Sequence, residues 1–75
     1  MRLESALMVA KRFIYYRSPG GLLGSFEPLK ASKEQKNGRF YWIIKCKYTK
    51  GRIIKVAEIV IQDSTGEIIG FEILP

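Results

Sequence analysis

The first apolar residues of the chain recur at the spacing of an amphipathic helix. Between residues 3 and 17 they lie at Leu3, Ala6, Leu7, Ala10, Phe13 and Ile14. This i, i+3, i+4, i+7 pattern puts them in one stripe, with polar residues on the opposite side. Glu4 lies in the first turn and Lys11, Arg12 and Arg17 lie toward the end, an order that complements the helix dipole. The pattern predicts one helix over about residues 3–17 with a single buried face.

A long connection over residues 18–38 follows, rich in glycine, proline and lysine. Ser18 precedes Pro19, and a residue before proline disfavours helical geometry, so the helix should end there. We expect mainly loop, with one short irregular strand, and a mobile surface turn over residues 33–38. The apolar residues that should contact the core, as a partial strand or a wide turn, are Leu22, Leu23, Phe26 and Leu29.

Apolar and polar residues alternate strictly in the next segment, residues 39–48. One side would carry Phe40, Trp42, Ile44, Cys46 and Tyr48, and the other Tyr41, Ile43, Lys45 and Lys47. Successive side chains of a strand point to opposite faces, so this period of two predicts a half-buried strand. The even-numbered side chains, Trp42 included, should lie beneath the helix.

Two further apolar runs complete the chain. Residues 52–62 are apolar at most positions, so this run is either the central strand or a strand with a bulge that changes face. A turn at residues 49–51 precedes it. Asp63-Ser64-Thr65-Gly66 is a stronger turn signal, because aspartate suits the first position of a type I turn and glycine suits a left-handed position. The last strand is expected over residues 67–74.

These elements predict one α+β domain over residues 1–75, an N-terminal helix packed on a three- to four-stranded antiparallel β-meander. A chain of 75 residues has room for one small core. The single cysteine cannot form an intramolecular disulfide, and no Cys/His cluster offers metal-ligand spacing. Packing alone must therefore hold the fold. We expect a cytoplasmic protein with no bound metal or cofactor, no export signal and no membrane span.

Catalysis is not expected from this composition. The chain has no histidine, the side chain that most often transfers protons near neutral pH. Asp63 and Glu67 are explained by turn chemistry and solvation, and Cys46 by burial beside Trp42. The glycines at 20, 21 and 24 have neither the preceding strand nor the following helix of a phosphate-binding loop.

Positive charge gives the chain one alternative function. The net charge of +6 is high for 75 residues and permits attraction to nucleic acid, although surface lysines often serve only solubility. Basic and aromatic side chains on an open sheet face could neutralise phosphates and stack bases. The residues expected to form such a nucleic-acid or partner surface are Tyr41, Lys45, Lys47, Lys50, Arg52 and Lys55.

The last strand has no lysine or arginine to protect its edge. Strict alternation would put Ile69, Phe71 and Ile73 on one face, and Ile68, Gly70, Glu72 and Leu74 on the other. Exposed strand edges pair readily with other strands, and cations commonly prevent this. The unprotected edge predicts either capture of an extended peptide or a homodimer formed by strand pairing.

The order of the elements, with the run Thr65-Gly66-Glu67 in the final hairpin, resembles the PepSY family and the wider set of cystatin-like small domains. The chain departs from the family pattern where Gln62 stands in place of an aspartate, and Asp63 follows one position later. The resemblance implies a non-catalytic module that binds peptides or restrains a partner enzyme. We therefore expect a binding or regulatory module for a protein or peptide partner, with nucleic-acid binding as the alternative.

Overall fold

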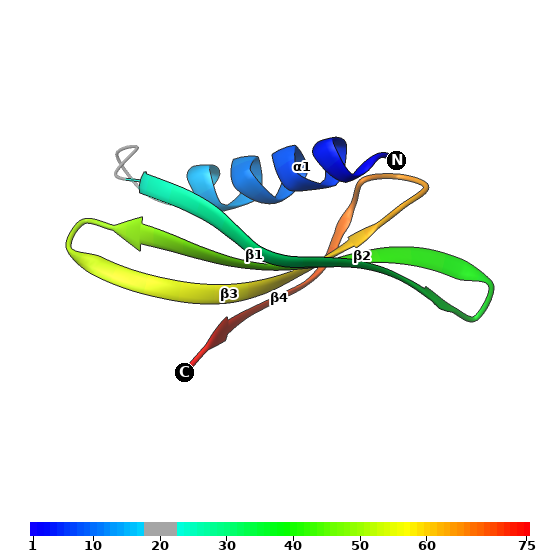
Figure 1. The fold of residues 1–75 in the computed structure, drawn as a ribbon. Helices are drawn as coiled ribbons and strands as arrows, with labels where there is room; N and C mark the ends of the chain where they lie inside the picture. The colour runs from blue at the N-terminus through cyan, green and yellow to red at the C-terminus, as the bar shows by residue number, and fades with distance from the viewer. Residues whose placement is uncertain (18–22) are drawn as a thin grey trace.

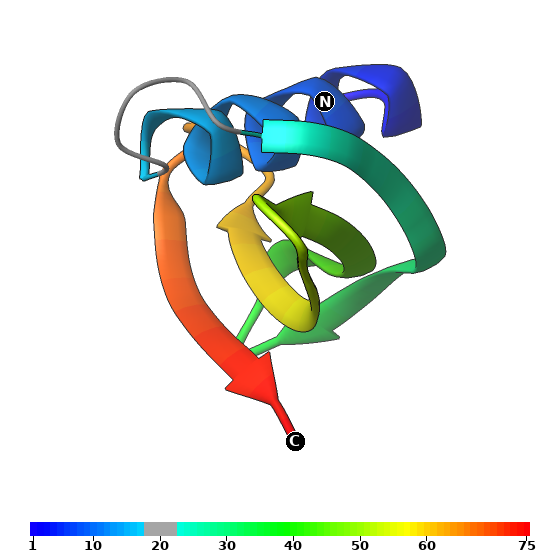
Figure 2. The same cartoon turned by 90° about the vertical axis from the view of Figure 1, so that its left-hand side faces the viewer.

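A computed structural model describes residues 1–17 and 23–75. It contains α1 (Leu3–Tyr16), β1 (Leu23–Lys36), β2 (Arg39–Lys50), β3 (Ile53–Gln62) and β4 (Ile68–Leu74). The strands form one antiparallel four-stranded sheet in the order β1-β2-β3-β4. The helix lies across one face of this sheet, with β1 and β4 at opposite sides beneath it (Figures 1 and 2). The predicted α+β architecture is confirmed, with four strands.

The core lies between α1 and the two inner strands. Ala6 and Ala10 are fully buried, and their small side chains let the helix approach the sheet closely. Beneath them Ile44 of β2 and Ile59 of β3 are opposite each other in register and both fully buried. Full burial of one such side chain contributes about 1.5–3 kcal/mol. A small set of residues therefore supplies most of the stabilising free energy.

The C-terminal end of α1 is attached to β4 by aromatic contacts. The rings of Phe13 and Phe71 meet edge to face, with centroids 5.1 Å apart. The Arg17 guanidinium carbon lies 4.8 Å from the Phe71 centroid and 5.2 Å from the Phe13 centroid. Edge-to-face and cation–π contacts each add roughly 0.5–1.5 kcal/mol. They extend the packing of the helix to the last strand of the sheet.

The prediction of a loop over residues 18–38 is wrong from Leu23 onward. β1 pairs with β2 along its length, with register shifts between Leu23 and Ser25 and between Pro28 and Lys30. Instead of a mobile turn over residues 33–38, the strand continues to Lys36. The turn itself is tight, because Asn37 and Gly38 both have positive φ, 54° and 75°, as a type I′ hairpin turn requires.

The apolar residues of the expected loop that were predicted to contact the core differ in how far they are buried. Phe26 packs against the core, as predicted, whereas Leu29 is 47% exposed at the irregular part of β1. Leu22 and the rest of residues 18–22 lie outside the described residues, as does the side chain of Leu23. The core contact of β1 is therefore made mainly through Phe26.

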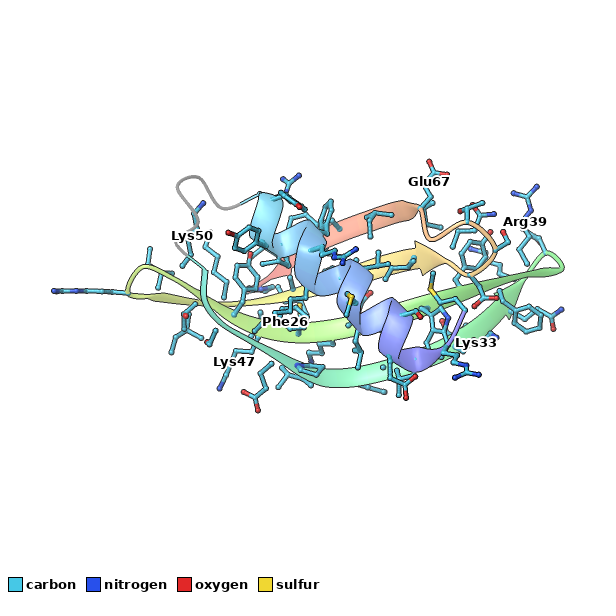
Figure 3. The ribbon with its side chains drawn as sticks, turned by 90° about the horizontal axis from the view of Figure 1, so that it is seen from above. Phe26, Lys33, Arg39, Lys47, Lys50 and Glu67 are labelled. Atoms are coloured by element: carbon cyan, nitrogen blue, oxygen red, sulfur yellow. The ribbon has the colours of Figure 1, made fainter. Side chains whose placement is uncertain are left out.

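The alternation along β2 is confirmed over most of its length. Ile44, Cys46 and Tyr48 are buried on the helix face, and Trp42 is half-buried against the same core. Phe40 is the exception, with 46% of its surface exposed. It lies beside Arg39, which projects at the end of the sheet beyond the first turn of α1 (Figure 3). The helix is too short to cover this end of the strand.

The last two strands resolve the alternatives left open for residues 52–62. β3 is an internal strand whose Ala57, Ile59 and Ile61 are buried in strict alternation. The irregularity lies instead opposite it on β4, where Ile61 pairs with Ile68 and Val60 pairs with Gly70. Ile69 is therefore an additional residue in the ladder, and it changes the face to which β4 side chains point.

Candidate binding surfaces

The outer face of the sheet, opposite α1, is not covered by any other described element (Figure 2). Tyr41, Ile43 and Val60 are half-buried there, and Ile69 is 51% exposed. An open hollow of about 780 Å³ lies over these side chains. Its remaining lining comes from the end of the β1–β2 hairpin, at Glu34, Gln35, Lys36 and Asn37. The hollow combines an apolar floor with a polar wall, as binding sites commonly do.

Charges of both signs cross the middle of this outer face. Lys30 is paired with Lys45, Lys45 with Glu58, and Glu58 with Glu72, so one row runs from two lysines to two glutamates. Lys47 lies 3.6 Å from a carboxylate oxygen of Glu27. The outer face therefore carries nearly balanced charge.

The residues predicted to form one basic surface are divided between two faces. Tyr41, Lys45 and Lys47 lie on the outer face, as expected. Lys55 is paired with Tyr48, whose side chain is buried on the helix face. Lys50 and Lys55 both line a small pocket near the C-terminal end of α1 (Figure 3). Arg52 lies in the exposed turn between β2 and β3. A single continuous surface of these residues does not exist.

β4 is an edge strand, with only β3 as its neighbour. The predicted face shared by Ile69, Phe71 and Ile73 is wrong, because the extra residue of the ladder separates Ile69 from the other two. Phe71 and Ile73 pair with Ile59 and Ala57 on the helix side. Ile69 instead lines the hollow of the outer face. β4 therefore presents Ile69 to the outer face, and Phe71 and Ile73 to the helix side.

Asp63 has a structural role that the sequence pattern did not indicate. Its Oδ1 accepts a hydrogen bond from Trp42 Nε1 at 2.8 Å and one from the Met1 ammonium at 3.0 Å, and Lys33 Nζ lies 3.7 Å away. The bonds from the ammonium and the indole hold the pKa of the carboxyl below its usual range. Gly66 has a φ of 74°, so the left-handed glycine of this turn is confirmed. A half-buried indole N–H needs an acceptor, and that need is the signal by which this role of Asp63 could have been found.

Cys46 is fully buried and opposite Ala57 in register. Burial raises the pKa of its thiol from 9.0 to about 11. The thiolate is the nucleophilic form, so this side chain is unsuited to covalent catalysis at neutral pH. Within residues 1–17 and 23–75, no group of three or more His, Cys, Asp or Glu side chains is arranged to hold a metal ion.

The raised thiol pKa predicts a loss of stability in alkaline solution. The folded protein keeps its proton up to about pH 11, whereas an unfolded thiol loses it near pH 9.0, so the free energy of unfolding falls across that interval. One thiol contributes a slope of at most about 1.4 kcal/mol per pH unit. Urea unfolding of the wild type and Cys46→Ala between these limits is the measurement. We expect their stabilities to converge as pH rises, and a constant difference would contradict the assignment.

Comparison with known proteins finds no family model, no curated protein and no solved structure that matches this chain. Among the described residues, α1 is neither long nor apolar enough to span a membrane, and there is no other helix.

Proposed function

We propose that this chain is a non-catalytic binding module that engages an extended protein or peptide segment along the free edge of β4. The observation that supports this most directly is the edge itself. β4 has seven residues, Ile-Ile-Gly-Phe-Glu-Ile-Leu, with no cation to discourage strand pairing. A partner strand would gain main-chain hydrogen bonds from this edge and side-chain contacts from its two faces.

The opposite edge of the sheet is much less suited to pairing. β1 carries Lys30, Lys33 and Lys36, and its register is interrupted beside Pro28. Lysines, prolines and bulges are the features by which proteins keep sheet edges from pairing. β4 is the less protected edge, because it has no lysine or proline and its ladder with β3 is regular from Gly70 to Leu74.

Charge on the outer face indicates the chemistry of the partner. Glu58 and Glu72 are directly opposite each other on β3 and β4. Like charges in this position destabilise a sheet, and a cation beside them would relieve the repulsion. On the same face, Leu74 lies two positions after Glu72. Two positions before it is Gly70, which has no side chain, so a partner side chain there can contact the adjacent Ile69. We infer a partner segment with a lysine or arginine opposite Glu72 and apolar residues two positions to either side.

A second copy of this chain is a less suitable partner than a basic segment. If two β4 strands paired antiparallel about Glu72, the Glu72 carboxylates of the two copies would lie beside each other. Glu72 is already opposite Glu58, so this pairing would add to the repulsion. The homodimer remains an outcome that sedimentation would reveal. The resemblance to PepSY and cystatin-like domains supports restraint of a partner enzyme, and the single buried cysteine supports a cytoplasmic location.

Nucleic-acid binding by the outer face has weaker support. The lysines there, Lys30, Lys36, Lys45 and Lys47, share the face with carboxylates, which would repel phosphates. These carboxylates are Glu27, Glu34, Glu58 and Glu72. A face with balanced charge lacks the electrostatic footprint of a nucleic-acid surface.

Two capped heptapeptides of alternating threonine and valine, one with a central lysine and one with a central glutamate, test the proposal. We expect both to shift backbone amide NMR signals of β4, and the lysine peptide to bind up to about fivefold more tightly. Glu72→Gln should remove most of this preference, and Glu4→Gln, in the exposed first turn of α1 on the opposite face of the sheet, should keep it. Shifts centred on β1, or equal binding of both peptides by the wild type, would contradict the proposal.

A further inference from the structure

We propose that a small basic pocket on the helix side of the sheet binds a phosphate group. It lies where the C-terminal end of α1, the β2–β3 hairpin and β4 come together, and its volume is about 150 Å³. Its charged and polar lining consists of Arg17, Tyr48, Lys50 and Lys55, and Phe71 and Ile73 form an apolar wall. This site is on the opposite side of the sheet from Glu72 and the outer-face hollow, so phosphate binding does not require the proposed peptide binding, although both sites use β4.

Among the described residues, no carboxylate forms an ion pair with the cations of this pocket. The ion pairs among the described residues join Asp63 to Met1 and Lys33, and Glu27 to Lys47, whereas none includes Arg17, Lys50 or Lys55. No acidic residue lines the pocket, and residues 18–22, which follow α1, contain none. Neighbouring cations without a counterion repel one another, so binding of an anion here removes an unfavourable interaction.

Two of the polar groups are held in place before any anion arrives. The Arg17 guanidinium lies over the rings of Phe71 and Phe13, at 4.8 and 5.2 Å from their centroids. Tyr48 is only 5% exposed, so its ring is fixed by the core, and its hydroxyl is the one polar group that it can offer to an anion. Groups fixed in advance lose little conformational freedom on binding, which increases affinity.

The size and the donors of the pocket favour a phosphate group over other anions. The three cations of the lining come from separate segments: Arg17 caps the C-terminal end of α1, Lys50 ends β2 and Lys55 belongs to β3. A tetrahedral dianion has enough oxygens to accept from all of them and from the Tyr48 hydroxyl, whereas a planar carboxylate has two. A pocket of about 150 Å³ has room for one phosphate group.

Inorganic phosphate is the first probe, titrated at about pH 7.5, where it is mainly a dianion, with ionic strength held constant by sodium chloride. We expect saturable amide shifts centred on Arg17, Tyr48, Lys50 and Lys55. Lys50→Gln and Lys55→Gln should each weaken binding roughly tenfold, because each removes a charge-assisted hydrogen bond. Lys47→Gln has the same change in net charge on the opposite face and should bind as the wild type does.

Titrations with further ligands distinguish the possible sources of the phosphate group. Acetate should bind more weakly than phosphate. A nucleotide site would bind adenosine 5′-monophosphate more tightly than inorganic phosphate, and a site for free phosphate would bind the two equally well; either result supports the pocket. Adenosine is the control that lacks the phosphate group. Thermal unfolding of each variant verifies that it is folded. Non-saturable shifts, shifts spread over the outer face, or an equal loss in Lys47→Gln would overturn the proposal.

Discussion

Replacing Ile59 by alanine is expected to lower the free energy of unfolding by about 3–4 kcal/mol. Ile59 is fully buried at the centre of β3, where it pairs with Ile44 on one side and Phe71 on the other. The substitution removes the transfer free energy of the lost methyl and methylene groups and leaves a cavity beneath α1. A domain of this size has about 4–11 kcal/mol in total, so much of its stability would be lost. Urea unfolding followed by Trp42 fluorescence is the measurement.

The same strand supplies a matched control for this change. Ile54 is 64% exposed near the beginning of β3, so Ile54→Ala deletes the same atoms from a position that is mostly in water. We expect a loss of no more than about 0.5 kcal/mol. Similar losses for the two variants would mean that the core is not centred beneath α1.

The second large effect is expected for Trp42→Ala, about 3 kcal/mol. The half-buried indole packs against the core, and its Nε1–H donates to Asp63 at 2.8 Å. Lys33 Nζ lies 5.6 Å from the ring, so the substitution also removes a cation–π contact. Thermal and urea unfolding of the variant measure the combined loss.

Trp42→Phe separates packing from hydrogen bonding at this site. It keeps an aromatic ring but removes the indole N–H, so the pKa of Asp63 should rise toward its ordinary value. A carboxyl with a depressed folded pKa stabilises the protein above its unfolded pKa, and that stabilisation disappears as pH falls through the folded value. Trp42→Phe should therefore lose less stability than the wild type on acidification below about pH 4. An unchanged Asp63 titration in NMR would disprove the bond.

The helix and β2 were predictable because each has one clear period, and β3 and β4 because each is an apolar run bounded by turn signals. β1 was not, because it lies at the edge and few of its residues face the core. Phe26 packs there, whereas Leu29 and the lysines of the strand are exposed. A strand of this kind has the composition of a loop, and only its pairing with β2 reveals it. Hydrophobic periodicity reports burial, so it cannot find an element that is mostly in water.

The candidate sites were less predictable than the fold. The alternation of side chains along β2 correctly placed Lys45 and Lys47 on the face away from the core. The local sequence did not show that Glu27 and Glu58 would lie beside them. The position of Ile69 depends on one extra residue in the ladder with β3, which the alternation of β4 does not reveal. The basic pocket joins α1 with the β2–β3 hairpin, and contacts between such distant segments require the tertiary structure.

The order of the strands in the sheet has a consequence for how the chain folds. β2, β3 and β4 each pair with the preceding strand, so every ladder closes through a short turn. Little loop-closure entropy therefore opposes strand pairing. Only the docking of α1 joins distant segments, since Ala6, Ala10 and Ile14 must meet residues of β2 and β3. The meander can therefore assemble by successive hairpins, and capture of the helix is the step with the greatest entropic barrier.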